Sequence, residues 1–228
     1  MRIDVITLFP EAFSPLDLSI IGRARNVGIV ELHLHNLRDF STNRHRKVDD
    51  KPFGGGAGMV IMVEPVYRAL KKIKEENKEA CTIILSPAGR VFTQALAREL
   101  SLKNGLIFIC GHYEEIDERV RSFVDLEISI GDYVLTGGEI AAMVVIDAVT
   151  RLLPGVLPEG AVKEDSFTDD CLLDWPHYTR PAQWHNLSVP EVLLSGDHRK
   201  IAAWRKKAAE ERTRRLRPDL WEKYLTKK

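Results

Sequence analysis

Short apolar runs alternate with segments of helical periodicity along the first two thirds of the chain. Runs of apolar and β-branched residues predict strands over residues 3–8, 30–35, 82–85, 106–110 and 126–130. Apolar positions three or four residues apart predict helices over 64–74, 93–100, 115–123 and 139–152, the second with Thr93 as N-cap. This alternation of strands and helices predicts an α/β fold with a mainly parallel sheet.

The pattern changes after residue 153. Proline and glycine interrupt it between 154 and 160, and the polar, acidic segment 163–174 is typical of an interdomain linker. A helix is predicted over 198–217, with Ile201, Trp204 and Ala208 on one face, and Pro218 ends it.

Composition and charge narrow the class of protein. The chain has 228 residues, 44% hydrophobic and 29% charged, which argues against disorder or a collagenous chain and suits one or two globular domains. Its net charge of zero excludes a wholly basic nucleic-acid binder, but residues 191–228 carry 12 Lys/Arg against 6 Asp/Glu. This basic tail predicts a polyanionic partner, although a solvated helix face would give the same charge pattern.

Three scattered cysteines, Cys81, Cys110 and Cys171, form no CxxC pair, which disfavours a disulfide framework or a zinc site. Asp4 and Pro10 interrupt the opening apolar run, so we expect no signal peptide. No stretch reaches the roughly 20 apolar residues of a membrane span. We therefore expect a cytoplasmic protein with no membrane association.

Several common catalytic motifs are absent from the sequence. The glycine cluster 54–58 lacks the GK[ST] ending of a phosphate-binding loop, and no GxGxxG, GxSxG or HExxH occurs. His33 and His35 lie on one side of a predicted strand, but no third metal ligand accompanies them, so a structural pair is favoured over a metal site.

A glycine-containing turn follows each of three apolar strands, at residues 86–89, 111–114 and 131–138. Loops at the carboxyl ends of parallel strands converge at one edge of a sheet, where ligands bind. The three turns could therefore surround a small ligand, or they could be plain βα turns in which glycine and proline serve geometry alone.

These loops match longer motifs: LSPAG at 85–89, CGHYEEIDER at 110–119 and SIGDYVLTGGE at 129–139. Others are VITLFP at 5–10, HRKVDDKPFGGG at 45–56, EDSF at 164–167, DWPHYTRP at 174–181 and LSGDH at 194–198. Together they cover nearly the whole chain in order, and the chain resembles the bacterial tRNA (guanine-N1)-methyltransferase family, TrmD.

The resemblance implies a SPOUT-type α/β fold with a deep trefoil knot, one of the few exceptions to unthreaded topology. It implies a knotted domain over 1–160, a flexible linker over 161–174 that carries the catalytic aspartate, and a small helical, basic C-terminal domain over 175–228. The implied substrates are S-adenosylmethionine and the tRNA anticodon stem-loop, with methylation at N1 of the guanosine immediately 3′ of the anticodon (G37). The family also implies a homodimer with its active site at the subunit interface, and magnesium without a dedicated protein cage.

Site residues follow from the same resemblance, with Asp165 as the general base and Arg151 as the group that stabilises charge on O6. The implied cofactor-binding residues are Leu85, Pro87, Gly89, Gly111, Tyr113, Glu114, Ser129, Ile130, Gly131, Asp132, Tyr133, Val134, Leu135, Gly137 and Gly138. The implied substrate-binding residues are Asp50, Gly55, Gly58, Asp174, His177, Arg180, Ser195, Gly196 and Arg199.

Guanine N1 carries a proton at neutral pH, so methylation there needs a base, and an arginine or magnesium could stabilise the charge that develops on O6. Each residue also has a plain interpretation: Asp165 as an N-cap ahead of Ser166, and Arg151 as a cation at a helix C-terminus.

The sequence departs from the family pattern at Ala57, Ile84, Glu115 and Ala141, and Asp169-Asp170 adds a residue to the linker. These departures bear on cofactor affinity and loop dynamics. Two alternatives stay open: a related knotted methyltransferase acting elsewhere, for example at a ribose 2′-oxygen, and a non-catalytic RNA-binding protein.

Overall fold

The computed structural model describes residues 1–158, 160–161, 165–167 and 171–227. The chain divides into two compact units, Met1–Pro158 and Glu159–Lys228. No helix in these described ranges is long and apolar enough to cross a membrane.

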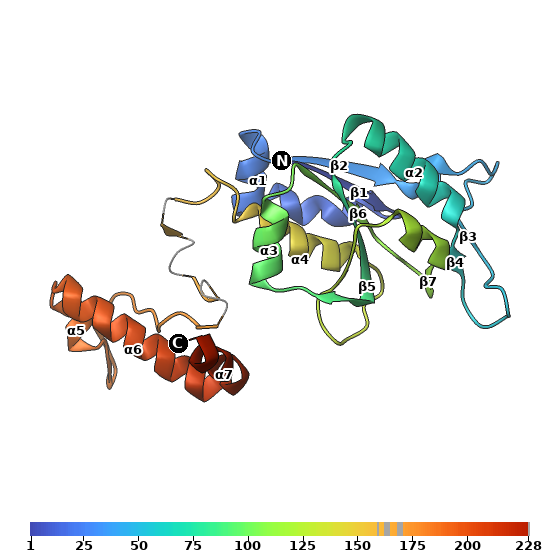
Figure 1. Ribbon diagram of the computed structural model, residues 1–228. Coiled ribbons are helices and arrows are strands. Elements are labelled where there is room, and N and C mark those ends of the chain that lie inside the picture. Colours follow the sequence, from blue (N-terminus) through green and yellow to red (C-terminus); the bar gives the residue numbers. More distant parts are fainter. Residues whose placement is uncertain (159, 162–164, 168–170, 228) are drawn as a thin grey trace. The chain divides into compact units, whose positions relative to one another are not determined.

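A five-stranded parallel sheet forms the centre of the first unit (Figure 1). Its strands run in the order β2 (Glu31–Asn36), β1 (Arg2–Thr7), β6 (Gly105–Ile109), β5 (Cys81–Val91) and β8 (Leu126–Ser129). All five residues of β6 are buried, because the strand is central and helices cover both faces of the sheet. The predicted α/β class with a parallel sheet is confirmed.

Helices cover the two faces of the sheet and enclose two separate cores (Figure 1). The larger core lies under α1 (Ser19–Asn26), α3 (Gln94–Ser101), α4 (Glu139–Thr150) and the 3-10 helix η1 (Pro10–Asp17). The other lies under α2 (Val63–Glu76), with the 3-10 helices η2 (Leu37–Phe40) and η3 (Glu118–Phe123). Neighbouring residues such as Phe108 and Ile109 point into opposite cores, as side-chain alternation along a strand requires.

A charged group is buried in the sheet. Asp4 is fully buried in β1 and accepts hydrogen bonds from Arg2 (2.9 Å), Asn77 (3.0 Å) and the His35 ring (2.8 Å). Burial alone would raise the pKa of Asp4, but the bonds from His35, Arg2 and Asn77 outweigh it and lower that pKa to about 2. His35 is thus part of a buried hydrogen-bond network, which agrees with a structural role for this histidine.

The predicted helix over 115–123 is wrong at its start, where residues 115–116 form a strand, and its remainder is a 3-10 helix over 118–123. Ile116 is buried beside Ile61, and β7 (Glu115–Ile116) pairs with β4 (Val60–Ile61), which in turn pairs with β3 (Asp49–Asp50). The side chain of Asp117 then accepts from the Arg119 amide and begins η3, which is a 3-10 helix. A buried strand pairing therefore overrides the helical periodicity. The predicted N-cap at Thr93 is confirmed by its bond from the Leu96 amide (3.3 Å).

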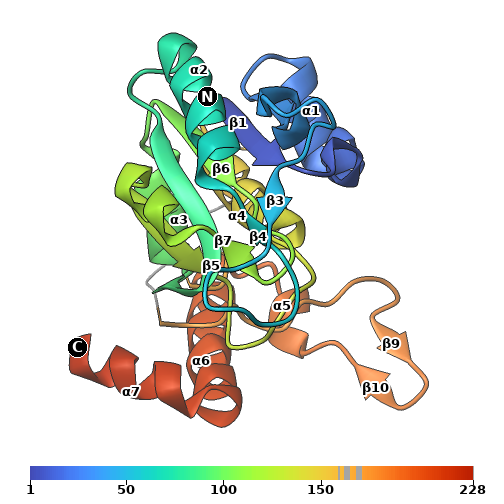
Figure 2. The ribbon, with the colours of Figure 1, turned by 90° about the vertical axis from the view of Figure 1, so that its right-hand side faces the viewer.

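The second unit contains a small hairpin, β9 (Gln183–Trp184) with β10 (Leu187–Ser188), and the helices α5 (Glu191–Leu194), α6 (His198–Leu216) and α7 (Pro218–Lys227) (Figure 2). Residues Ile201, Trp204 and Ala208 of α6 are partly buried, whereas Ala209 and Thr213 are fully buried. Pro218 ends α6 as predicted, but it also occupies the first position of α7, a helix that the pattern did not predict.

Candidate functional site

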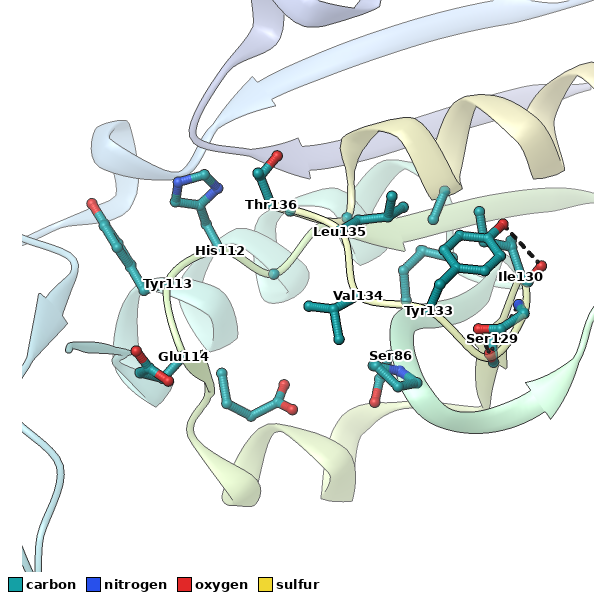
Figure 3. A pocket seen from close by; sticks show the side chains of 18 residues that line it. Ser86, His112, Tyr113, Glu114, Ser129, Ile130, Tyr133, Val134, Leu135 and Thr136 are labelled. Carbon is teal, nitrogen blue, oxygen red and sulfur yellow. Dashed lines mark hydrogen bonds between the residues drawn. The ribbon is translucent and has the colours of Figure 1, made fainter. Parts of the chain in front are cut away.

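Three loops, one within β5 and two after the carboxyl ends of β6 and β8, enclose a cavity of about 310 Å³ (Figure 3). Residues 111–115 line one side, residues 85–87 and 129–131 line another, and residues 133–138 lie between them. The second and third loops meet because the carboxyl ends of parallel strands lie at one edge of the sheet. The first loop leaves β5 beside Ile128, near the end of β8.

The first loop is an excursion inside β5. Leu85 and Arg90 both pair with Ile128 of β8, so residues 86–89 leave the sheet and the strand then resumes. A Cβ at Gly89 would lie 2.4 Å from the Ile128 amide nitrogen, so only glycine allows this close return. Burial tends to raise the pKa of Glu127 in β8, but the Arg121 guanidinium, and after it the nearby Ser86 hydroxyl, lower that pKa.

The second loop follows β6 and contacts the third. Gly111 accepts a hydrogen bond from the Gly138 amide (2.8 Å), and His112 forms a β-bridge with Gly137. Tyr113 has a φ of 64°, a left-handed conformation that is uncommon outside glycine, and is partly exposed at the pocket.

The third loop follows β8 and ends at the first turn of α4. The Tyr133 hydroxyl donates to the Ile130 carbonyl (3.2 Å), a bond drawn in Figure 3. A Cβ at Gly138 would lie 2.9 Å from Cys110 Cα and 3.0 Å from the Gly111 nitrogen. The backbones of the second and third loops are therefore in direct contact. Burial first, and the nearby Glu139 carboxylate second, raise the pKa of the Cys110 thiol, so Cys110 acts as an apolar core residue.

Most residues expected to bind a cofactor line this one cavity, and only Gly89 and Asp132 do not. Gly89 lies where the first loop returns to β5, with its backbone close to Ile128. The lining residues that the sequence reasoning missed are Ser86, His112, Glu115, Thr136 and Ala141. The first four belong to the same loops and could have been found by including every loop position. Ala141 lies on α4, where no loop signal pointed to it.

The expected substrate residues of the first unit lie in and beyond β3. Asp50 pairs with Lys47 (3.0 Å), and its hydrogen bond to Lys47 lowers its pKa. A Cβ at Gly58 would lie 2.4 Å from Glu114 Cγ, so the Gly58 backbone adjoins the pocket loop. Gly55 lies in the same glycine-rich loop with open space around it.

In the second unit, Asp174 contacts His177, also an expected substrate residue, and two residues that were not expected to take part. It accepts from the His177 ring (3.0 Å), lies 3.5 Å from Arg212, and its amide donates to Ser166 Oγ (3.0 Å). Arg180 lines a separate cavity of about 320 Å³ between residues 178–182 and the β9–β10 hairpin.

Ser195, Gly196 and Arg199 lie around the start of α6, where the Asp197 carboxylate accepts from the Arg199 amide (3.1 Å). Asp165 belongs to the second unit, whereas the pocket residues belong to the first. Glu164, Asp169 and Asp170 lie outside the described residues.

Arg151 lies at the far end of α4 from the pocket. Ala141, in the first turn, lines the cavity, and Arg151 follows ten residues later, a rise of about 15 Å along the helix. Within one chain the structure does not bring Arg151 to the pocket.

The residues also determine which bound groups the site could hold. The pocket offers apolar side chains, backbone donors and acceptors, and the carboxylates of Glu114 and Glu115. Among the described residues there is no group of three or more His, Cys, Asp or Glu side chains placed to hold a metal ion. The pocket therefore suits a small organic ligand with both polar and apolar parts.

Comparison with known proteins assigns the chain to a family. The model of the family described as tRNA (Guanine-1)-methyltransferase TrmD matches residues 1–223. A tRNA (guanine-N(1)-)-methyltransferase of Carboxydothermus hydrogenoformans is 61% identical over 210 residues, covering 91% of this chain and 82% of its own. Proteins with the same description from Moorella thermoacetica and Dictyoglomus turgidum are 56% and 52% identical, covering 96% and 98% of this chain and 90% and 91% of their own. The chain belongs to the tRNA (guanine-1)-methyltransferase family TrmD.

Proposed function

We propose that this chain transfers a methyl group from S-adenosylmethionine to N1 of a guanosine in tRNA, the one immediately 3′ of the anticodon. The observation that carries the proposal is the agreement of two findings. The family match spans residues 1–223, and the three motif loops that suggested the family form one cavity.

The cavity fits the proposed cofactor in size and chemistry. Its volume of about 310 Å³ lies within the range of small-molecule sites. The glycines at 111, 137 and 138 have no side chain and would let an adenine or ribose approach the backbone closely, and Leu85, Ile130 and Leu135 supply apolar surface. A cofactor bent within three such loops would present its methyl group outward.

A deep trefoil knot is part of this proposal. Its support is the path of the third loop, which runs against the second: Gly138 donates to Gly111 and its backbone packs against Cys110. The proposed domains are a knotted domain over 1–160, a linker over 161–174 and a tRNA-binding domain over 175–228.

Asp165 is the proposed general base. Its carboxylate takes the proton from guanine N1, which makes the N1 electron pair available. S-adenosylmethionine supplies an electrophilic methyl group: N1 bonds to that carbon while the carbon–sulfur bond breaks and its electrons stay on sulfur. The negative charge that spreads to O6 is stabilised by the Arg151 guanidinium. No step of this mechanism is assigned to magnesium.

The position of Arg151 supports a homodimer with a shared active site. About 15 Å of helix separates Arg151 from the pocket edge of its own chain, so the guanidinium would serve a partner's site. Ile140 and Val144 of α4 are 52% and 43% exposed, one turn apart, and give the outer face of this helix an apolar patch. A second copy of the chain would bury them.

The second unit is the proposed tRNA clamp. Helix α6 carries most of the tail's basic side chains, which would contact phosphates and set affinity more than sequence choice. The target base would have to leave the anticodon-loop stack to reach the pocket. Such a substrate places the activity in the cytoplasm.

The test of this function is transfer of labelled methyl from S-adenosylmethionine to an unmodified tRNA transcript. A matched transcript carries adenosine in place of the guanosine 3′ of the anticodon. We expect label on the first transcript only, with N1-methylguanosine identified by mass spectrometry. Label on both would indicate a related methyltransferase with another target, and tRNA binding without label would indicate a non-catalytic RNA-binding protein.

Replacing the proposed base tests the mechanism. We expect Asp165→Asn to lower kcat for methyl transfer by about 100-fold or more, because the amide cannot accept the N1 proton. Cofactor affinity, measured by calorimetry, should not change. Asp219→Asn, in the same unit and paired with Arg217, is the matched control. Near-normal turnover of Asp165→Asn would remove this residue as the base.

A further inference from the structure

A chain of contacts runs beneath the pocket and joins three segments that are far apart in sequence. Thr7, fully buried at the end of β1, donates its hydroxyl proton to Glu139 Oε1 (2.7 Å). The same hydroxyl oxygen accepts a hydrogen bond from the Phe9 amide (2.9 Å). Glu139 is itself buried in the first turn of α4. The end of β1 is thereby fixed to the start of α4.

The next contact leads from Phe9 to the pocket wall. The Phe9 and His112 rings meet edge to face, with centroids 5.0 Å apart. His112 lines the cavity, and its backbone is bridged to Gly137 of the third loop. Its ring nitrogen Nδ1 is buried and has no hydrogen-bond partner within the described part of the chain. A buried polar atom without a hydrogen-bond partner lowers the stability of the fold, so its presence calls for an explanation.

Gly137 brings the two ends of this chain of contacts together. A Cβ at Gly137 would lie 2.4 Å from Glu139 Oε2 and 2.8 Å from His112 Nδ1. The second oxygen of Glu139 and the unpaired nitrogen of His112 therefore flank the same small space beside Gly137. Contacts join Glu139 to Thr7, Thr7 to Phe9, and Phe9 to His112. A hydrogen bond between His112 and Glu139 would close this series of contacts into a ring.

We propose that Glu139 is a positioning residue for the pocket, and that His112 Nδ1–H donates to Glu139 Oε2 when a ligand occupies the cavity. His112, which carries the donor, and Gly137, which lies between the donor and the acceptor, both line the cavity. A ligand bound there would contact both residues and bring His112 Nδ1 towards Glu139 Oε2. Closing the link fixes the second and third loops to β1. The choice of an adenosyl compound as the ligand rests on the proposed function. The contacts among Thr7, Phe9, His112 and Glu139 do not depend on it.

A purely structural role for Glu139 is the competing explanation. An acidic side chain in the first helical turn is stabilised by the helix dipole. In that case the loss of Glu139 would lower thermal stability, and its effect on ligand affinity would not depend on His112. A double-mutant cycle separates these explanations.

The experiment measures S-adenosylhomocysteine binding by titration calorimetry for His112→Phe, Glu139→Met and the double variant. Phenylalanine keeps the ring contact with Phe9 but removes Nδ1. We expect each single variant to bind about tenfold more weakly, and the double variant to lose about tenfold rather than about 100-fold. His33→Phe and Glu99→Met, on the surface of the same unit, should bind as the wild type does.

Two further measurements keep the test decisive if Glu139→Met folds poorly. Nitrogen-15 spectra of wild-type histidines should show His112 Nδ1 becoming a hydrogen-bonded donor when ligand is added. Thr7→Val, which removes the opposite link, should weaken binding while Glu139 is intact. Additive losses, or an unchanged His112 signal, would overturn the proposal. Absence of ligand binding by the wild type would overturn the proposed function as well, whereas normal methylation with unaffected variants would overturn this inference alone.

Discussion

The pocket of the first unit and helix α6 of the second are built in opposite ways. The pocket loops extend from strands such as β6, of which every residue is buried, and their backbones touch at Cys110, Gly111 and Gly138. Only Ala209 and Thr213 are buried among the 19 residues of α6, and its surface is charged. The shape of the pocket is therefore fixed by close packing, whereas the function proposed for α6 depends on charge. The two should respond to different perturbations.

The largest effect is expected from a single methyl group in the pocket. Gly138→Ala would place Cβ against the backbone of Cys110 and Gly111, neither of which can move without disturbing β6. Gly138 has an ordinary φ of −79°, so the change tests packing alone. We expect cofactor binding to weaken by about 100-fold, with a lower melting temperature.

Gly111→Ala is the matched comparison. Its Cβ would lie 3.4 Å from the flexible Ile116 side chain, an ordinary contact. Its loss of affinity, measured by the same calorimetry, should be at least about tenfold smaller. Equal losses at the two positions would contradict the view that backbone contact sets the shape of the pocket.

Acid should destabilise the first unit through Asp4. The folded state lowers the pKa of Asp4 to about 2, below its unfolded value near 3.8. Its contribution is therefore complete above about pH 4 and is lost as the pH falls towards about 2, and it amounts to about 2 kcal/mol.

Asp4→Asn should lower the free energy of unfolding by about 2 kcal/mol at neutral pH and flatten its decline in acid. Urea unfolding at neutral and acid pH measures both effects. Asp39→Asn, at a surface pair with Arg46, is the control. An unchanged acid slope in Asp4→Asn would show that the buried network does not contribute.

The smallest effect is expected from changes to α6, whose proposed binding of tRNA depends on charge rather than on packing. Arg214→Ala with Arg215→Ala should weaken tRNA binding several-fold and reduce the dependence of log affinity on log salt by about 0.9 per lost phosphate contact. Cofactor affinity should not change. Lys71→Ala with Lys78→Ala in the first unit removes the same charge. An equal effect of that pair would mean that net charge, not α6, sets tRNA affinity.

Much of the fold could be predicted from the sequence because the inner strands of the central sheet are apolar runs separated by helical patterns. The strand at 106–110 and the N-cap at Thr93 are local signals, and the structure confirms both. The predicted helix over 115–123 failed because Ile116 pairs with Ile61, 55 residues earlier in the chain. Helix α7 was missed because Pro218 was interpreted only as the end of α6.

The candidate site was less accessible to sequence reasoning. Apolar strands followed by glycine turns indicated where the loops would meet, and the motif resemblance supplied the residue names. The partners of those loops could not be inferred. The contact of Gly58 with Glu114, and the meeting of His112 with Glu139 beside Gly137, depend on packing between segments that no local pattern relates.

The excursion of β5 has a consequence for how the site can vary. Because Leu85 and Arg90 both pair with Ile128, residues 86–89 are inserted into a strand that is complete without them. Changes in the length or sequence of this insert would leave the register of the sheet intact, provided that a glycine remains at its return point. Ligand preference and fold can therefore diverge independently here, which makes the insert a natural place to redesign specificity.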